Sequence, residues 1–225
     1  MKDSAPNVFV TDFDGTMTRL DFYDLATRDL PSVATRDYWQ DYVAGKYTHF
    51  EALAAIFASI RAPMEAVEEV LSLMDFDPAT AEAIQRLHAA NWRVIIASAG
   101  SSWYIRRLLA RAQIPEDAVE LHANPGVYAP ETGLVLSLPK DDPFFDADMG
   151  IGKAAIVADA LRRAPRVVFA GDGRPDLASA KLVVDGNRYA TGWLASRLHL
   201  DHIPFHPFDR WSHIVEHLLA ASPPA

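Results

Sequence analysis

Three short apolar runs, each followed at once by a polar turn, constrain the fold of this chain more than any other feature. A strand that is buried on both faces of a parallel sheet has a continuous apolar sequence of this kind. Between and after the runs, apolar residues recur at steps of three and four, which is the helical period. Strands that alternate with helices predict an α/β fold with a doubly wound parallel sheet and helices on both faces. The runs are Val8 to Val10, Val94 to Ala97 and Val167 to Ala170, and the helical segments are 80–90, 102–112, 151–163 and 209–220.

The stretch between the first and second runs breaks this alternation. It contains helix-period apolar residues and no convincing buried strand. We therefore expect an inserted helical unit over residues 19–77 and a core domain formed by residues 1–18 and 78–225. A second departure, at 126–136, predicts a β-hairpin around a Pro/Gly turn. The insertion is rich in aromatic residues that we expect for the most part to form its own core: Phe22, Tyr23, Tyr38, Trp39, Tyr42, Tyr47, Phe50 and Phe57.

The composition argues against several functional classes. The net charge is -9, and the longest basic runs are the pairs Arg106-Arg107 and Arg162-Arg163, so there is neither a nucleic-acid-binding stripe nor a polybasic membrane patch. No apolar run approaches membrane-spanning length, and the polar start Met1 to Ser4 contains no signal region. We therefore expect a cytoplasmic protein that binds neither nucleic acid nor membrane. The chain has no cysteine, which excludes thiolate metal sites.

The first apolar run leads directly into the pentapeptide Asp12-Phe13-Asp14-Gly15-Thr16. Because side chains alternate along an extended chain, Asp12 and Asp14 are expected to point the same way while Phe13 turns toward the packing. Ligands of open α/β sheets bind at the carboxyl ends of the strands, where this turn lies. Two carboxylates held so close repel each other, so the pair predicts a cation between them. Acids and glycine are also common in turns after strands, and the motif alone does not define a site.

Two further elements follow later apolar runs. Ser98 ends the second run and precedes a helix, so its hydroxyl and the free backbone NH groups of the turn predict a phosphate-binding site. A serine at this place also suits a helix cap. Lys153 opens a later helix, where it would offset the charge of a phosphoryl group, although a lone lysine is commonly solvated.

The fourth element, Gly171 to Asp176, again lies just past a buried strand and contains two acids, Asp172 and Asp176. With Asp12 and Asp14 they would place four carboxylates at one sheet edge. So many acids do not remain ionised together without a divalent cation. Oxygen ligands and the lack of cysteine favour magnesium over zinc.

In this order the four elements resemble the haloacid dehalogenase-like superfamily of aspartate-nucleophile phosphohydrolases, over nearly the whole chain. The resemblance implies a Rossmann-like core, and the insertion resembles the helical cap of the phosphoserine phosphatase branch. Asp21, nine residues after Asp12, matches a cap-proximal acid near the substrate in that branch. Segments 171–181 and 203–208 resemble the group that contains the methionine-salvage hydroxy-keto-methylthiopentenyl phosphate phosphatase and the phosphocholine and phosphoethanolamine phosphatases. Segment 141–148 departs from the salvage enzymes, which carry cysteines there.

The resemblance implies a magnesium-dependent phosphomonoester hydrolase that acts on a small phosphorylated metabolite through an aspartyl-phosphate. In this scheme Asp12 is the nucleophile, while Asp14 protonates the leaving oxygen and then deprotonates water. Magnesium would contact the Asp12 carboxylate, the Asp14 backbone carbonyl and Asp172, with Asp176 as a ligand or an orienting group. The phosphoryl oxygens would be held by Ser98, Lys153 and the NH groups of Gly15, Ala99 and Gly100, and Thr16 would brace the Asp12 loop.

Two alternatives remain open on the sequence alone. A phospho-acceptor receiver module also uses an aspartate, an acid pair, a hydroxyl residue, a lysine and magnesium on a doubly wound sheet. The Asp-x-Asp spacing and the large insertion argue against it. A phosphotransferase or phosphomutase on the same fold would pass the phosphoryl group to another hydroxyl, and the insertion would close over either acceptor.

Overall fold

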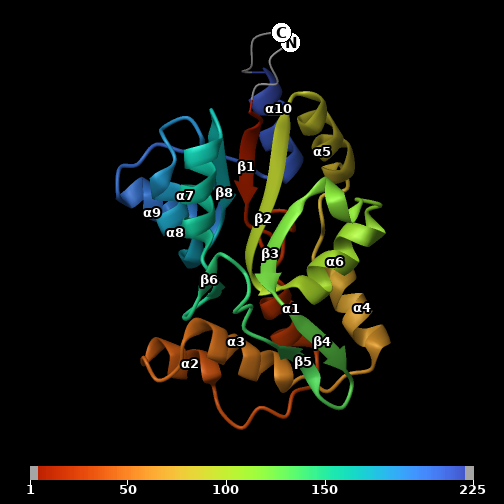
Figure 1. Ribbon diagram of the computed structural model, residues 1–225. Coiled ribbons are helices and arrows are strands. Elements are labelled where there is room, and N and C mark those ends of the chain that lie inside the picture. The colour runs from red at the N-terminus through yellow and green to blue at the C-terminus, as the bar shows by residue number, and fades with distance from the viewer. Residues whose placement is uncertain (1–4, 221–225) are drawn as a thin grey trace.

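The computed structural model describes residues 5–220, and six parallel strands form its main sheet (Figure 1). The order across the sheet is β10-β9-β8-β1-β2-β3. The predicted α/β, doubly wound architecture is therefore confirmed. The polar start Met1 to Ser4 and the Pro-containing tail, 222–225, lie outside the described residues. The strands are β1 (Asn7–Thr11), β2 (Trp92–Ser101), β3 (Glu120–Asn124), β8 (Val167–Gly171), β9 (Arg188–Ala190) and β10 (His206–Pro207).

The first strand lies at the centre of the sheet. β1 pairs with β2 on one side and with β8 on the other, so that Thr11 is level with Ile96 and Ala170. The chain first builds outward through β2 and β3 and then returns to the other side of β1. Where the order of the strands reverses, beside β1, the connections leave in opposite directions, and a crevice opens at the carboxyl ends of the strands. The sequence after β1 and the sequence after β8 both enter this crevice.

Two apolar layers cover the faces of the sheet, with α7, α8 and α9 on one side and α5, α6 and α10 on the other (Figure 1). On the first side, Val8 and Val10 pack with apolar residues of α7 and α9. On the second, Phe9 stacks on Trp211 of α10 at 5.2 Å between ring centroids. This alternation on a central strand explains why its sequence is apolar throughout. The helices are α5 (Thr80–Ala89), α6 (Ser102–Arg111), α7 (Lys153–Arg163), α8 (Leu177–Leu182), α9 (Gly192–Leu200) and α10 (Trp211–Ala220).

Two predicted boundaries need correction. β2 does not end at Ser98, because the strand continues to Ser101 through a register shift between Ala97 and Ser101 that lets the chain bulge. The helix expected from residue 151 begins at Lys153, since Gly150 and Ile151 form β7 (Gly150–Ile151) and pair with β6 (Phe145–Asp146).

Four helices lie between β1 and α5: α1 (Phe22–Asp29), α2 (Tyr38–Val43), α3 (His49–Ala58) and α4 (Met64–Leu73). We call this inserted unit, residues 19–77, the cap. Figure 1 shows α2 and α3 beyond the carboxyl ends of the strands. The predicted hairpin is confirmed as β4 (Gly126–Ala129) and β5 (Gly133–Leu136), and it packs on the cap, where the Tyr128 hydroxyl donates to the Ala62 carbonyl at 2.6 Å.

The expectation that the cap aromatics form a core of their own is wrong. Phe22 and Phe57 belong to one apolar cluster that also contains Phe9 and Trp211 of the core domain. The reason is the short connection from β1 to α1, which holds Phe22 at 4.6 Å from the Tyr104 ring of α6. The aromatics near α2 are only half-buried. No helix among residues 5–220 is long and apolar enough to cross a membrane.

Candidate active site

The pentapeptide after β1 forms the floor of a cavity of about 310 Å³ at the carboxyl ends of the strands. Asp12 and Asp14 line this cavity, whereas Phe13 is fully buried in the core, as the alternation predicted. The backbone NH of Asp12 donates to the Ala170 carbonyl at 2.9 Å and ties the turn to β8. Gly15 has a φ of +70°, and a Cβ there would collide with the Asp172 carboxylate. Glycine is therefore required both for the backbone conformation and for the close approach of the two loops.

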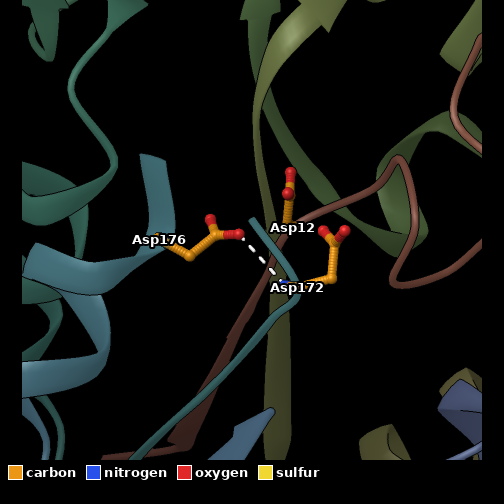
Figure 2. Close-up of side chains that lie close together, drawn as sticks. All are labelled: Asp12, Asp172 and Asp176. Atoms are coloured by element: carbon orange, nitrogen blue, oxygen red, sulfur yellow. Dashed lines mark hydrogen bonds between the residues drawn. The ribbon is translucent and has the colours of Figure 1, made fainter. Parts of the chain in front are cut away.

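Three carboxylates meet at this edge of the sheet (Figure 2). Oxygen atoms of Asp12, Asp172 and Asp176 lie within 4.8 Å of one another. Asp176 is fully buried, and its Oδ2 accepts hydrogen bonds from the backbone NH groups of Asp172 (3.1 Å) and Gly173 (2.9 Å). This side chain therefore folds the turn after β8 as well as contributing charge.

Lys153 is the counterion of the carboxylate cluster. Its Nζ lies 2.7 Å from Oδ1 of Asp12 and 2.7 Å from Oδ1 of Asp176, and its side chain is 5% exposed. Burial by itself lowers the pKa of Lys153, but the carboxylates of Asp12 and Asp176 outweigh burial and raise it. The ammonium is therefore charged at any physiological pH. Because Lys153 opens α7, the start of that helix fixes its position beside Asp12.

One buried ammonium does not balance three carboxylates. Burial, followed by the charge of Asp176, raises the pKa of Asp172 to about 7. Burial and the charges of Asp176 and Asp172 likewise raise the pKa of Asp12, against the opposing effect of Lys153. A second cation would relieve this repulsion. The donors are oxygen atoms only, which suits a hard divalent ion such as magnesium.

Asp14 lies in a different environment from Asp12. Its Oδ2 accepts a hydrogen bond from the Tyr104 hydroxyl at 2.7 Å, and its Oδ1 accepts one from the backbone NH of Phe22 at 3.1 Å. Burial raises the pKa of Asp14, and the hydrogen bonds from Tyr104 and Phe22 partly oppose the rise. The Asp14 side chain stands apart from the three clustered carboxylates, so the four acids predicted at one edge divide into a cluster of three and a separate fourth.

The Ser98 turn is folded back on itself. Ser98 is 1% exposed, and its hydroxyl oxygen accepts the backbone NH of Gly100 at 2.9 Å. Asn124, at the end of β3, donates to the Ala99 carbonyl at 2.7 Å and to the Met149 carbonyl at 3.1 Å. It thereby ties the Ser98 turn to the segment that precedes Lys153.

The remaining predicted residues are brought to the same region. Asp21 lines the cavity and caps α1, since its carboxylate accepts the Tyr23 backbone NH at 2.6 Å. Burial, followed by the charge of Asp14, raises the pKa of Asp21. Thr16 donates to Asp172 at 3.4 Å and so braces the loop as expected. The predicted site residues that line the cavity are Asp12, Asp14, Asp21, Ser98, Ala99, Gly100, Lys153 and Asp172. Asp176 lies behind them, and Gly15 faces a neighbouring cavity of about 270 Å³.

The sequence reasoning missed several residues that line the cavity. Tyr104 stood out only as a phenol in the otherwise apolar stripe of α6. Three others, His49, Trp39 and Tyr23, belong to the cap. Contacts between the cap and the core domain cannot be predicted from local sequence patterns. Their place on the cavity follows from the way the cap folds back over the strand ends.

Comparison with known proteins places this geometry in context. The sequence model of a family described as haloacid dehalogenase-like hydrolase matches residues 9–181. A substrate-bound phosphoserine phosphatase complex has 14% identity and a TM-score of 0.63, with 97% of this chain and 99% of that chain covered. A phospho-aspartyl intermediate analogue of phosphoserine phosphatase has 14% identity and a TM-score of 0.63, with 96% and 99% covered. A probable phosphoserine phosphatase from Vibrio cholerae has 17% identity and a TM-score of 0.65, with 96% and 65% covered. These structures share the fold, and no curated protein gives a significant match.

Proposed function

Because this chain belongs to the haloacid dehalogenase-like hydrolase family, we propose that it is a magnesium-dependent phosphomonoester hydrolase that acts on a small phosphorylated metabolite through an aspartyl-phosphate. One observation carries the proposal: the Asp12 carboxylate lies on a cavity at the carboxyl end of the central strand, beside a buried ammonium and two further acids. A nucleophile, a fixed cation and hard oxygen ligands are the parts that phosphoryl transfer requires.

The reaction proceeds in two displacements. An oxygen of Asp12 attacks phosphorus in line, and the bond from phosphorus to the ester oxygen breaks as Asp14 gives its proton to that oxygen. Water then attacks the aspartyl-phosphate while Asp14 takes the proton, which releases inorganic phosphate and restores Asp12. Burial raises the pKa of Asp14, which favours the protonated form that the first step needs.

The chain's own residues hold the phosphoryl group and its charge. The buried ammonium of Lys153 stays charged beside Asp12 and neutralises oxygens of the transferring group. The Ser98 hydroxyl and the backbone NH of Ala99 also contribute to the phosphate site, whereas the predicted Gly100 NH already donates to the Ser98 hydroxyl oxygen. Magnesium would be held by the carboxylates of Asp12 and Asp172 and by the Asp14 backbone carbonyl, with Asp176 as a ligand or an orienting group. When bound, it would supply positive charge to the phosphoryl oxygens.

For the leaving group, we propose an alcohol that carries an ammonium group. The cap residues on the cavity include the acids Asp21 and Asp24 and the aromatic rings of Tyr23 and Trp39, and they include no lysine or arginine. Acids and aromatic faces attract an organic cation, with a contribution of about 0.5–2 kcal/mol from each favourable ring. Within the group that the sequence resembles, this wall favours a phosphocholine or phosphoethanolamine substrate over the apolar ester of methionine salvage.

Release of phosphate from p-nitrophenyl phosphate tests the hydrolase. We expect turnover that depends on magnesium, is abolished by EDTA and is lost in Asp12→Asn. Asp117→Asn is the matched control, because Asp117 is an exposed acid near the amino end of β3, at the opposite edge of the sheet. Full activity in Asp12→Asn would refute the nucleophile, and equal losses in both variants would point to a general defect.

The lifetime of the phosphorylated protein separates the hydrolase from its alternatives. We expect acetyl phosphate to label the wild type only transiently, because Asp14 is placed to activate water. A label that persists for hours would favour a receiver module. Transfer of the label to an added sugar hydroxyl, in preference to water, would favour a phosphotransferase. A panel containing phosphoethanolamine, phosphocholine, phosphoserine and glycerol phosphate then tests the leaving group.

A further inference from the structure

A histidine of the cap lines the substrate cavity, and one of its ring nitrogens is buried without a partner. His49 is the first residue of α3, and it faces the same cavity as Asp12, Ser98 and Lys153. Its residue is 7% exposed, and its Nδ1 has no hydrogen-bond partner among residues 5–220. A buried polar atom without a partner is unfavourable, and such atoms are rare in folded proteins. Because Nδ1 itself is buried, a ligand in the cavity can meet only the exposed remainder of this side chain.

Asp148 fixes the start of α3, and two aromatic rings pack against the imidazole. The backbone NH of His49 donates to the Asp148 carboxylate at 3.1 Å, and the next NH in the chain donates to the Asp148 carbonyl at 2.8 Å. The rings of Trp39 and Tyr42 meet the imidazole edge-on, at 5.4 and 5.5 Å between centroids. A side chain fixed in this way loses little conformational entropy when it binds a partner.

The imidazole is also neutral at physiological pH. Burial, with a smaller contribution from the charge of Lys153, lowers the pKa of His49 to about 4. A neutral imidazole has one nitrogen that donates and one that accepts. It therefore pairs with a hydroxyl or an amino group and does not act as a fixed charge for a phosphate.

The neighbours of His49 place it at the leaving-group end of the cavity. Leu53 and Phe57, one and two turns further along α3, line the same cavity, and Trp39 and Tyr23 complete this wall. The groups expected to hold phosphate all come from the core domain. The cap side of the cavity thus consists of aromatic and apolar side chains, two acids and this one imidazole. A largely apolar wall with a few placed polar groups is the usual composition of a specificity pocket.

We propose that His49 is a specificity-determining residue whose imidazole hydrogen-bonds a hydroxyl or amino group on the alcohol part of the phosphate ester. This inference rests on the proposed hydrolase function and adds to it the residue that selects the alcohol. A site built to pair with a polar group discriminates strongly against an analogue that lacks the group, because its own polar atom is then left unpaired.

Three esters of nearly equal size test the proposal: 2-aminoethyl phosphate, 2-hydroxyethyl phosphate and ethyl phosphate. In the wild type, kcat/KM for at least one polar ester should exceed that for ethyl phosphate by about tenfold or more. In His49→Phe this preference should collapse toward one, mainly through KM. His49→Gln should keep part of the preference, since an amide also donates and accepts. His88→Gln, at an exposed histidine of α5, should change nothing.

Other outcomes would overturn the inference. If the preference for a polar ester over ethyl phosphate is equal in the wild type and His49→Phe, the imidazole does not select the alcohol part of the substrate. If His49→Phe lowers turnover of all substrates alike, including p-nitrophenyl phosphate, the residue supports the phosphate end or the structure of α3. If the wild type hydrolyses p-nitrophenyl phosphate but shows no preference among the three esters, this inference fails and the hydrolase proposal stands. Absence of hydrolysis of every ester would instead refute the hydrolase proposal.

Discussion

The hydrogen bond between Tyr104 and Asp14 makes a prediction that can be worked out from the structure. Both groups are buried, and the phenol donates to Oδ2 of Asp14 at 2.7 Å. Tyr104→Phe removes this donor and keeps the ring, which packs against Phe22 at 4.6 Å and Phe13 at 6.5 Å. The substitution therefore changes the electrostatics of Asp14 with little change in packing.

The magnitude follows from the charge of the acceptor. A hydrogen bond to a charged group contributes about 1.5–3 kcal/mol, and about 1.4 kcal/mol corresponds to a tenfold change in a proton equilibrium. The Tyr104 hydroxyl lowers the pKa of Asp14 because it stabilises the carboxylate. Without the hydroxyl the pKa of Asp14 rises. The alkaline limb of the kcat/KM profile, where Asp14 loses the proton that it gives to the leaving oxygen, should move to higher pH by about one to two pH units.

A second substitution tests the same contact from the other side. A Cβ at residue 100 would overlap the Tyr104 hydroxyl and also crowd Oδ2 of Asp14, so Gly100→Ala should break the hydrogen bond between them. Both variants should move the alkaline limb in the same direction when hydrolysis of an alkyl phosphate is followed from pH 5 to 10. Trp103→Phe, one residue earlier on α6, serves as a control. An unchanged limb in Tyr104→Phe, or a shift to lower pH, would refute the assignment of that limb to Asp14.

Three further predictions follow from the buried charges. Lys153→Met leaves the carboxylates of Asp12 and Asp176 without their cation, so it should lower the free energy of unfolding in EDTA by about 3 kcal/mol or more, as measured by urea denaturation. The same variant should lower phosphatase activity by about 100-fold or more in steady-state kinetics. Millimolar magnesium should raise the Tm of the wild type and not that of Asp172→Asn, and an equal rise in both would exclude Asp172 from the metal site. The free energy of unfolding should fall as the pH falls from about 6.5 to 4: the pKa of His49 is about 4 in the folded state and about 6.5 in the unfolded state, so the unfolded chain binds the proton first, at a cost on the order of 3 kcal/mol. In His49→Gln this part of the pH dependence should be absent. If the free energy of unfolding of that variant falls as much as that of the wild type between about pH 6.5 and 4, the prediction is contradicted.

Local sequence was sufficient for the features that depend on neighbouring residues. The apolar runs, the turns after them and the periods of α5 and α6 are written in short segments, so the sheet and its functional edge could be predicted. Lys153 and Asp12 are far apart in the chain, and the sequence predicts only that both lie at the same edge of the sheet. Their direct contact is a finding of the structure.

The features that escaped prediction depend on how the cap packs. Tyr104 reaches Asp14 only because residue 100 is a glycine and because Phe22 holds the start of the cap against α6. His49 reaches the cavity only because the Asp148 segment fixes the first turn of α3. Each of these contacts joins two elements, and the spacing of residues along the chain does not predict how those elements pack against each other. Ser98 shows the same limit at short range, since the bulge that carries β2 on to Ser101 leaves no clear sequence signal.

In the proposed mechanism, the two acids of the opening motif have different chemical roles on one short turn. Asp12 and Asp14 have the same side chain and the same cavity, so only their partners distinguish them. Asp12 faces a permanent cation, Lys153, which opposes the rise in pKa that burial and the charge of Asp176 cause at this carboxyl. Asp14 faces the neutral donors Tyr104 and the Phe22 backbone NH, which only partly oppose the rise in pKa that burial causes. A proton carrier must exist in both forms during one cycle, and neutral donors allow this where a cation would not. Exchange of the partners should therefore exchange the properties: a lysine at Tyr104 would lower the pKa of Asp14 and stop it from protonating the leaving oxygen. Hydrolysis of alkyl esters, which depends on that proton, should then fall far more than hydrolysis of p-nitrophenyl phosphate, whose leaving group departs without it. Equal losses on the two substrates would show that the partners do not divide the roles.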